Sequence, residues 1–338
     1  MGRHLYLYDK NFQLESGGEL EGLEIDYHSY GSLNKEKNNV VWVCHALTAN
    51  SDCADWWSGL VGEGKIFDPK KYFIVCANIL ASCYGSSRPL STNKKNKKNY
   101  FSDFPVVTVR DMVNAHIILR KHLGIEKINI AIGGSMGGYQ VVEWAYAEKN
   151  VFDHLVLTTT GARESAWGIA IHTAQRLAIE ADPTWKDHSA KAGAKGLKAA
   201  RAIGMLTYRN YLQFHKTQTD DDHNKLDDYK SASYIHYQGE KLVERFNVYS
   251  YWLLTKAMDS HNLARGRGKL EDVLKEIKTK ALVVGISSDF LCPVAEQKYL
   301  AKHLGNASFK EIESPYGHDG FLIEGEKLAE LIRAFLPA

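Results

Sequence analysis

Short runs of apolar residues, many of them β-branched, alternate along the chain with stretches in which apolar residues recur every three to four positions. The short runs are typical of buried strands, and the recurring pattern is typical of amphipathic helices. Strands are predicted at 40–47, 72–80, 127–134, 154–160 and 280–287. Helices are predicted between them, for example at 109–123 and 140–147. This alternation predicts an α/β fold with a mostly parallel sheet flanked by helices.

The pattern changes after the fourth predicted strand, where no further strand is predicted over more than a hundred residues. Stretches with helical periodicity follow one another there, at 167–181, 194–212 and 237–258. The acidic tract at 219–230 is typical of a solvated loop. We therefore expect a helical lid inserted at 161–278 into an α/β core formed by 1–160 and 279–338.

Charge and composition narrow the class of partner. Lys and Arg total 42 against 40 Asp and Glu, which gives a net charge of +2 in 338 residues. Such a chain has no electrostatic footprint for nucleic acid or an anionic membrane, so a small molecule is the expected partner. Its apolar runs are far shorter than a bilayer span, and residues 1–10 lack the apolar segment of a signal peptide. The five cysteines show neither metal-ligand spacing nor a disulfide framework, so we expect a cytoplasmic protein without a bound metal.

A glycine-rich stretch surrounds one serine where a predicted strand meets a predicted helix: NIAIGGSMGGYQVVEWAY, Asn129–Tyr146. Gly133 and Gly137 flank Ser135 in a G-x-S-x-G frame, the setting of a nucleophile elbow. So sharp a turn exposes the hydroxyl, and side chains at the two glycine positions would collide with the adjoining strand or helix. A less specific interpretation also stands, in which Ser135 only caps a helix that packs closely on the sheet.

A serine hydroxyl is a weak nucleophile, so the elbow requires a histidine base and an acid to orient it, both later in the chain in this type of fold. Asp289 follows a predicted strand in VVGISSDFLCP, and His318 lies in a glycine-flanked loop in ESPYGHDGFL. Taken singly, each could be an ordinary loop residue. Together, Ser135, Asp289 and His318 have the chain order of the α/β-hydrolase triad, and we predict that they are catalytic.

Seven segments resemble the homoserine O-acyltransferase family, in particular its homoserine O-acetyltransferases: WVCHALTAN, FIVCANILASCYGSSRP, IGGSMGGYQVVEWA, ARAIGMLTYRN, YQGEKLVERFN, LVVGISSDFLCP and YGHDGFL. The resemblance runs over nearly the whole chain, and the fourth and fifth segments are not found in generic α/β hydrolases. Arg88 and Ala49 stand where the family usually has glycine. Arg88 falls at the expected acyl-donor end of the site.

The resemblance implies an acetyl transfer in two steps, as part of methionine biosynthesis. Ser135 would attack the thioester of acetyl-CoA with His318 as base, and the side-chain hydroxyl of L-homoserine would then attack the acetyl-serine, a ping-pong sequence. Backbone N–H groups of Leu47 and Met136 would form the oxyanion hole. His45 is expected to be structural. Acetyl-CoA is a co-substrate here, and no other cofactor is expected.

Recognition of the acceptor follows from its charges. A free amino acid is a zwitterion, so its site needs one cation and one anion. By resemblance, Arg209 would bind the carboxylate of homoserine and Asp319 its ammonium group. The lid would roof a narrow, poorly wetted tunnel and so favour transfer over hydrolysis.

Similar proteins pair through their lid helices, which implies a homodimer. The first helical stretch carries an apolar row that fits such an interface and packing onto the core equally well: Trp167, Ile171, Ala174, Leu177 and Ala178. Both interpretations stay open.

Three other functions are compatible with the sequence. A few residues of the binding cavity decide donor and acceptor, so homoserine or serine O-succinyl transfer is one alternative, and a plain serine esterase is another. A non-catalytic binding protein of the same fold is disfavoured, because such proteins have typically lost a triad member and this chain has all three.

Overall fold

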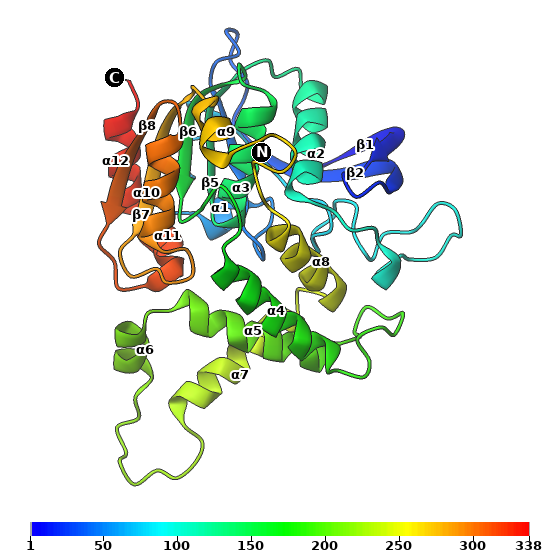
Figure 1. The fold of residues 1–338 in the computed structure, drawn as a ribbon, viewed down its shortest axis with the longest axis vertical. Coiled ribbons are helices and arrows are strands. Elements are labelled where there is room, and N and C mark those ends of the chain that lie inside the picture. Colours follow the sequence, from blue (N-terminus) through cyan, green and yellow to red (C-terminus); the bar gives the residue numbers. More distant parts are fainter. Residues whose placement is uncertain (1, 338) are drawn as a thin grey trace.

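A single sheet forms the centre of the computed structural model, which describes residues 2–337 (Figure 1). Its eight strands have the order β1-β2-β4-β3-β5-β6-β7-β8. β2 pairs with β1 and β4 in antiparallel fashion, and the remaining neighbours are parallel. The strands are β1 (Gly2–Gln13), β2 (Glu19–Tyr30), β3 (Val40–Cys44), β4 (Phe73–Ala77), β5 (Ile128–Gly134), β6 (Phe152–Thr158), β7 (Lys280–Ile286) and β8 (Ala307–Ile312).

Helices connect the parallel strands and fill the long segment between β6 and β7. Within residues 2–337, every helix is too short or too polar to traverse a lipid bilayer. The α-helices are α1 (Cys53–Trp56), α2 (Val109–His122), α3 (Met136–Ala147), α4 (Ala166–Glu180), α5 (Ala194–Tyr208), α6 (Tyr211–Gln218), α7 (Lys230–Val243), α8 (Val248–Asp259), α9 (Leu270–Lys275), α10 (Val294–His303), α11 (Gly320–Ile323) and α12 (Gly325–Phe335).

The five strands predicted from the sequence are β3 to β7, so the predicted α/β fold with a mostly parallel sheet is confirmed. The prediction missed β1, β2 and β8. Most side chains of β1 and β8 are exposed or half-buried, so these edge strands lack a buried apolar run. In β2, half-buried or exposed acidic residues stand between the buried apolar ones, so this strand has no continuous apolar run either.

Alternate residues of the inner strands enter two separate hydrophobic clusters. Trp42 and Cys44 of β3 belong to the cluster that contains side chains of α2 and α3. Val41 and Val43 belong to the other, together with side chains of α1 and α12. Burial on both faces explains why these strands read as continuous apolar runs.

The register of the sheet brings several loops to its carboxyl edge. Cys44 at the end of β3 pairs with Gly133 of β5. Gly134 at the end of β5 pairs with Thr158 of β6, which pairs with Val284 near the end of β7. The loops that leave β3, β5 and β7 therefore start side by side, at the edge where open parallel sheets bind ligands.

Between β6 and β7 the chain forms α4 to α9, and Figure 1 shows α4 to α7 gathered on one side of the sheet. Two stretches predicted as continuous helices are broken: 194–212 is split into α5 and α6, and 237–258 includes the break between α7 and α8. Asn210 and Asn247 cause the breaks, because each side chain accepts a hydrogen bond from a backbone N–H in the first turn of the following helix.

Not all residues of the apolar row predicted on α4 face the core. Trp167 and Leu177 are 52% and 61% exposed, so packing onto the core is wrong for both. The face that α4 buries consists of Gly168, Ile171, His172, Gln175, Arg176 and Ile179. Polar residues turn inward because His172 and Arg176 both pair with Asp259 of α8, at 2.8 and 2.5 Å.

Candidate active site

Ser135 occupies the turn between β5 and α3 in a strained conformation, with φ 55° and ψ −128°. A positive φ is rare for a residue with a Cβ and is typical of sites where the surroundings impose it. The side chain makes no capping hydrogen bond to α3, so the interpretation of Ser135 as a helix cap is wrong. The residue is only partly buried, as an elbow nucleophile has to be.

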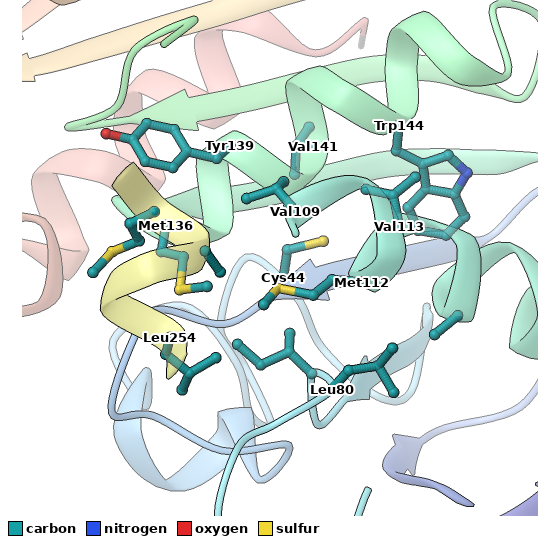
Figure 2. Close-up of a cluster of buried hydrophobic side chains, with 14 of the residues drawn as sticks. Cys44, Leu80, Val109, Met112, Val113, Met136, Tyr139, Val141, Trp144 and Leu254 are labelled. Carbon is teal, nitrogen blue, oxygen red and sulfur yellow. The ribbon is translucent and has the colours of Figure 1, made fainter. Parts of the chain in front are cut away.

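The outer glycines of the turn leave no room for side chains. A Cβ at Gly133 would lie well inside contact distance of the Gly137 carbonyl, and a Cβ at Gly137 would collide with the carbonyl of Cys44 in the same way. The predicted collisions are therefore confirmed. Figure 2 shows Met136 and Cys44 in one buried cluster. The close approach of Gly137 to the Cys44 carbonyl puts the start of α3 against the end of β3.

The inner glycines are equally constrained. A Cβ at Gly134 would lie 2.5 Å from the ring of Phe321, and a Cβ at Gly138 would lie 2.5 Å from the side chain of Thr160. The Phe321 ring also packs edge-on against the imidazole of His318, with centroids 5.6 Å apart. Because Gly134 has no side chain, Phe321 can pack close to the elbow, and His318 packs against Phe321.

His318 and Asp289 form a buried pair, with 4% and 5% of their surfaces exposed. His318 Nδ1–H donates to Asp289 Oδ2 at 2.7 Å. The other carboxylate oxygen accepts hydrogen bonds from the backbone N–H groups of Leu291 and Cys292, both at 2.9 Å. These contacts fix the carboxylate, which in turn fixes the imidazole tautomer and leaves Nε2 as the acceptor.

Electrostatics tune His318 as a base. Burial lowers its pKa, but the charge of Asp289, its hydrogen bond and the nearby Asp319 and Glu164 carboxylates together outweigh burial. The pKa of His318 therefore lies above its ordinary value of 6.5. A raised pKa makes the neutral imidazole a stronger base toward the Ser135 hydroxyl.

Asp289, Cys292 and His318 are the only three potential metal ligands of residues 2–337 that cluster, with one ligand atom from each within 4.8 Å of the others. Burial raises the pKa of the Cys292 thiol well above its ordinary value, which keeps it protonated and a poor ligand. The imidazole and the carboxylate already share a hydrogen bond. The donor set suits proton transfer better than metal binding.

A cavity of about 490 Å³ opens above the elbow, a size that suits a small molecule. Ser135, His318, Asp319 and Leu47 line it, together with residues of α4, α5 and α7. Ser135 and His318 both line this cavity, and within residues 2–337 no direct hydrogen bond joins their side chains. Such bonds are often long before substrate binds.

The two backbone donors expected for an oxyanion hole are available. Neither the Leu47 nor the Met136 N–H takes part in a hydrogen bond within the described chain. Met136 is the first residue of α3, where unpaired N–H groups and the helix dipole favour negative charge. The close approach of Gly137 to the Cys44 carbonyl brings this helix terminus against the loop that carries Leu47.

His45, in the same loop, has the structural role expected from the sequence. Its Nδ1–H donates to the Ala46 carbonyl at 2.8 Å, and its Nε2 accepts from the Ile79 N–H at 3.1 Å. Both ring nitrogens are thus used within the protein. Complete burial lowers the pKa of His45 to about 4, so it stays neutral.

Arg209 and Asp319, the residues expected to bind the acceptor, pair with each other at 3.1 Å. Arg209 follows α5 in an extended conformation, and its Nε–H donates to the Tyr234 hydroxyl at 3.2 Å. Asp319 lines the cavity and Arg209 does not. Burial raises the pKa of Asp319 above its ordinary value, although Arg209 opposes this shift.

Sequence reasoning missed Arg201 of α5, which does line the cavity. Its guanidinium lies over the Tyr208 ring at 5.4 Å, and its buried Nε has no hydrogen-bond partner in the described chain. The Tyr208 ring in turn lies 6.0 Å from that of His318. A signal was available, because a spacing of seven residues in ARAIGMLTYRN puts Arg201 and Tyr208 on one helix face.

A half-buried carboxylate just before α4 was missed as well. Glu164 lines the cavity and accepts a hydrogen bond from the Tyr139 hydroxyl at 3.1 Å. Partial burial raises its pKa. Burial and the charges of Glu164 and Asp289 raise the pKa of the neighbouring Glu296 to about 7. The carboxylates Glu164 and Asp319 therefore line the same cavity as the cations Arg201, Lys241 and Arg245.

The two departures from the resembled family lie in different places. Ala49 lines the cavity that contains Ser135. Arg88 instead lines a separate cavity with Glu24 and Ser91, near the antiparallel strands. Arg88 therefore does not line the cavity that contains Ser135, because its loop pairs with β2 through the Ser87 N–H and the Glu24 carbonyl.

Comparisons with known proteins agree with this geometry. The family model described as alpha/beta hydrolase fold matches residues 39–324. A homoserine O-acetyltransferase of Cyclobacterium marinum is 47% identical over 335 residues, covering 99% of this chain and 95% of the relative. The chain belongs to the homoserine O-acetyltransferase family. A member of that family from Chlorobium luteolum is 42% identical over 339 residues, covering 98% of this chain and 94% of the relative.

Solved structures share the fold. A homoserine O-acetyltransferase from Bacillus anthracis has a TM-score of 0.94 at 23% identity, covering 100% of this chain and 98% of the other. The esterase E22 has a TM-score of 0.90 at 22% identity, covering 99% and 100%. At these identities the likeness shows the α/β-hydrolase fold alone. Membership of the homoserine O-acetyltransferase family is shown by the sequence relatives.

Proposed function

We propose that this chain transfers the acetyl group of acetyl-CoA to the side-chain hydroxyl of L-homoserine. One observation carries the proposal: the cavity that contains Ser135 and His318 also presents a cation, Arg201, and an anion, Asp319. A zwitterionic amino acid needs this pair, and a simple ester does not. The names of the full-length relatives point to the same acceptor.

In the first half-reaction, Ser135 Oγ attacks the thioester carbonyl carbon and its proton passes to His318 Nε2. The Leu47 and Met136 N–H groups stabilise the tetrahedral oxyanion. When the C–S bond breaks, the CoA sulfur takes the proton from His318. In the second half-reaction the hydroxyl of homoserine attacks the acetyl-serine, and its proton passes through His318 to Ser135 Oγ.

For the acceptor we assign the carboxylate to Arg201, because this residue lines the cavity and its buried Nε has no hydrogen-bond partner within residues 2–337. Asp319 accepts the ammonium group. Arg209 then acts through Asp319: their 3.1 Å pair keeps the carboxylate ionised and in place. By resemblance, Arg209 would bind the carboxylate of homoserine. In this assignment it contacts Asp319 and not the substrate.

We assign acetyl-CoA as the donor, because the relatives that span nearly the whole chain are named homoserine O-acetyltransferases.

A steady-state assay of acetyl-CoA and succinyl-CoA against homoserine, serine and water tests the proposal. We expect acetyl-CoA with homoserine to have the highest kcat/KM. Hydrolysis faster than transfer to homoserine would identify an esterase instead. Faster turnover of succinyl-CoA would identify a succinyltransferase, and a preference for serine would reassign the acceptor.

We also propose that the chain works as a homodimer in the cytoplasm, in methionine biosynthesis. The exposed side chains of Trp167 and Leu177 on α4 support pairing through the helical segment between β6 and β7. The five cysteines are all free, as is usual in a reducing compartment. Sedimentation of the purified chain tests the dimer.

A further inference from the structure

Gln140 lies in the second turn of α3 and is completely buried. Its Nε2 donates two hydrogen bonds, to the carbonyls of His45 and Met136, both at 3.1 Å. Its Oε1 accepts a hydrogen bond from His116 Nε2 at 3.0 Å. Both N–H groups of the amide are therefore used, and the orientation of the amide is fixed by its three partners.

The two carbonyls belong to the two segments that supply the proposed oxyanion donors. Met136 provides one N–H itself, and His45 comes two residues before Leu47, which provides the other. The Gln140 side chain thus joins the start of α3 to the loop after β3. The same loop is held from its far side, where the Ile79 N–H donates to the His45 ring.

His116 of α2 holds the amide from below. Its ring is buried and stacks on Trp144, with centroids 5.5 Å apart and an interplanar angle of 11°. Burial lowers the pKa of His116 to about 4, so the ring is neutral and has one N–H to donate. With that N–H on Gln140 Oε1, a flipped amide would set two donors against each other at His116 and two acceptors against each other at the carbonyls of His45 and Met136.

We propose that Gln140 is the positioning residue of the oxyanion hole. By tying the His45 carbonyl to the Met136 carbonyl, it sets the separation and direction of the Leu47 and Met136 N–H groups without touching the substrate. The inference rests on the proposed reaction through Ser135. Gln140 is thus a buried side chain that positions an oxyanion hole made of backbone N–H groups.

Two variants test it. Gln140→Met keeps the length of the side chain and removes its donors; Gln140→Glu keeps its size and the acceptor for His116 but replaces the donors with a carboxylate. Because displaced donors lose most of their effect on the transition state, we expect kcat to fall on the order of 10-fold to 100-fold in both. The KM for acetyl-CoA should stay within about twofold.

Gln297→Met is the matched control. Gln297 of α10 is also completely buried, and its Nε2 donates to the Thr160 carbonyl at 2.9 Å. Its loss should lower the thermal midpoint of unfolding about as much as the loss of Gln140, with kcat unchanged. A purely structural role for Gln140 would make the two Met variants behave alike.

A second readout isolates the oxyanion hole. An alkyl boronic acid adds to Ser135 as a tetrahedral adduct, so its affinity should weaken in the Gln140 variants by the same factor as kcat and stay unchanged in Gln297→Met. A folded Gln140→Met with kcat within about threefold of wild type, or an equal loss in Gln297→Met, overturns the proposal.

Running the same variants on p-nitrophenyl acetate separates this inference from the proposed function. If the wild type cleaves the ester in a Gln140-dependent way but does not move acetyl from acetyl-CoA to homoserine, the proposed function falls and the role of Gln140 stands. If acetyl transfer is normal and the Gln140 variants match the wild type on both substrates, the inference alone falls.

Discussion

The two walls of the catalytic cavity are built in different ways. On the sheet side, Ser135 is held in a turn without room for neighbouring side chains, and His318 and Asp289 are almost completely buried. On the helical side, Arg201 of α5 lies over the Tyr208 ring, and its buried Nε has no hydrogen-bond partner within residues 2–337. Next to this wall Arg209 pairs with Asp319, and 29% and 22% of their side chains are exposed.

This contrast assigns the two walls to different tasks. The chemical step needs groups that do not move, because a displacement of about 1 Å can cost 100-fold in rate. In the proposed acceptor site, Arg201 has to take up a carboxylate and Asp319, beside Arg209, has to admit an ammonium group. Backbone geometry suits the first task, and flexible charged side chains suit the second.

Ser135→Ala removes the centre of the rigid wall and should have the largest effect. We expect kcat to fall on the order of 10⁵-fold to 10⁶-fold, since no other residue supplies the nucleophile. Wild-type enzyme incubated with acetyl-CoA alone should gain about 42 Da on Ser135, one acetyl group, in mass spectra. Ser16→Ala, in an exposed turn, is the control. An adduct on any other residue would remove the elbow assignment.

Asp289→Asn should have the next largest effect, a loss of about 10⁴-fold in kcat, because the imidazole loses its correct tautomer. The pH profile sharpens the test. His318 must be neutral to act as base and its pKa is raised, so kcat/KM of the wild type should fall on the acid side of a midpoint above pH 6.5. Without the Asp289 charge that midpoint should move to lower pH. A fully active Asp289→Asn would assign the orienting role to another carboxylate.

Arg201→Ala tests the flexible wall and should separate the two half-reactions. Acetylation by acetyl-CoA should stay near normal, while homoserine turnover falls about 30-fold to several thousand-fold, the effect of truncating one partner of a charge pair worth roughly 2 to 5 kcal/mol. Arg209→Ala should lose less, about 10-fold, because it acts through Asp319. Burst and single-turnover kinetics measure each step. A larger loss in Arg209→Ala would return the acceptor carboxylate to Arg209.

Changes on the outer surface of α4 should have the smallest effect. Trp167→Ser combined with Leu177→Ser removes exposed apolar groups that do not line the cavity. We expect kcat within about twofold of wild type and a shift from dimer to monomer in sedimentation. An unchanged dimer would place the interface elsewhere.

The rigid wall could be predicted almost completely from the sequence. Steric conflict at Gly133 involves Gly137, four positions later, so a short motif records it. The conflict of Gly137 with the Cys44 carbonyl is not local, but the strand–turn–helix setting of the motif implies it. The triad acid and base could be predicted because chain order and position after a strand restrict the candidates. Both signals are local or follow from the order of the elements.

The flexible wall could be predicted only in part. The place of Arg201 in the cavity, and the lack of a hydrogen-bond partner for its buried Nε within residues 2–337, depend on the whole surroundings. The inward face of α4 is decided by Asp259, which lies 83 positions after Arg176 in the chain. The Gln140 network joins residues of three separate elements, and no spacing in the sequence reveals it.

The crowded turn around Ser135 also limits how the gene can change. Every codon reached from a glycine codon by one nucleotide substitution either keeps glycine, adds a Cβ or stops translation. At Gly133, Gly134, Gly137 and Gly138 the added carbon has no space. Mutational libraries of this gene should therefore return active clones that all encode glycine at these four positions, although the glycine codons themselves can differ.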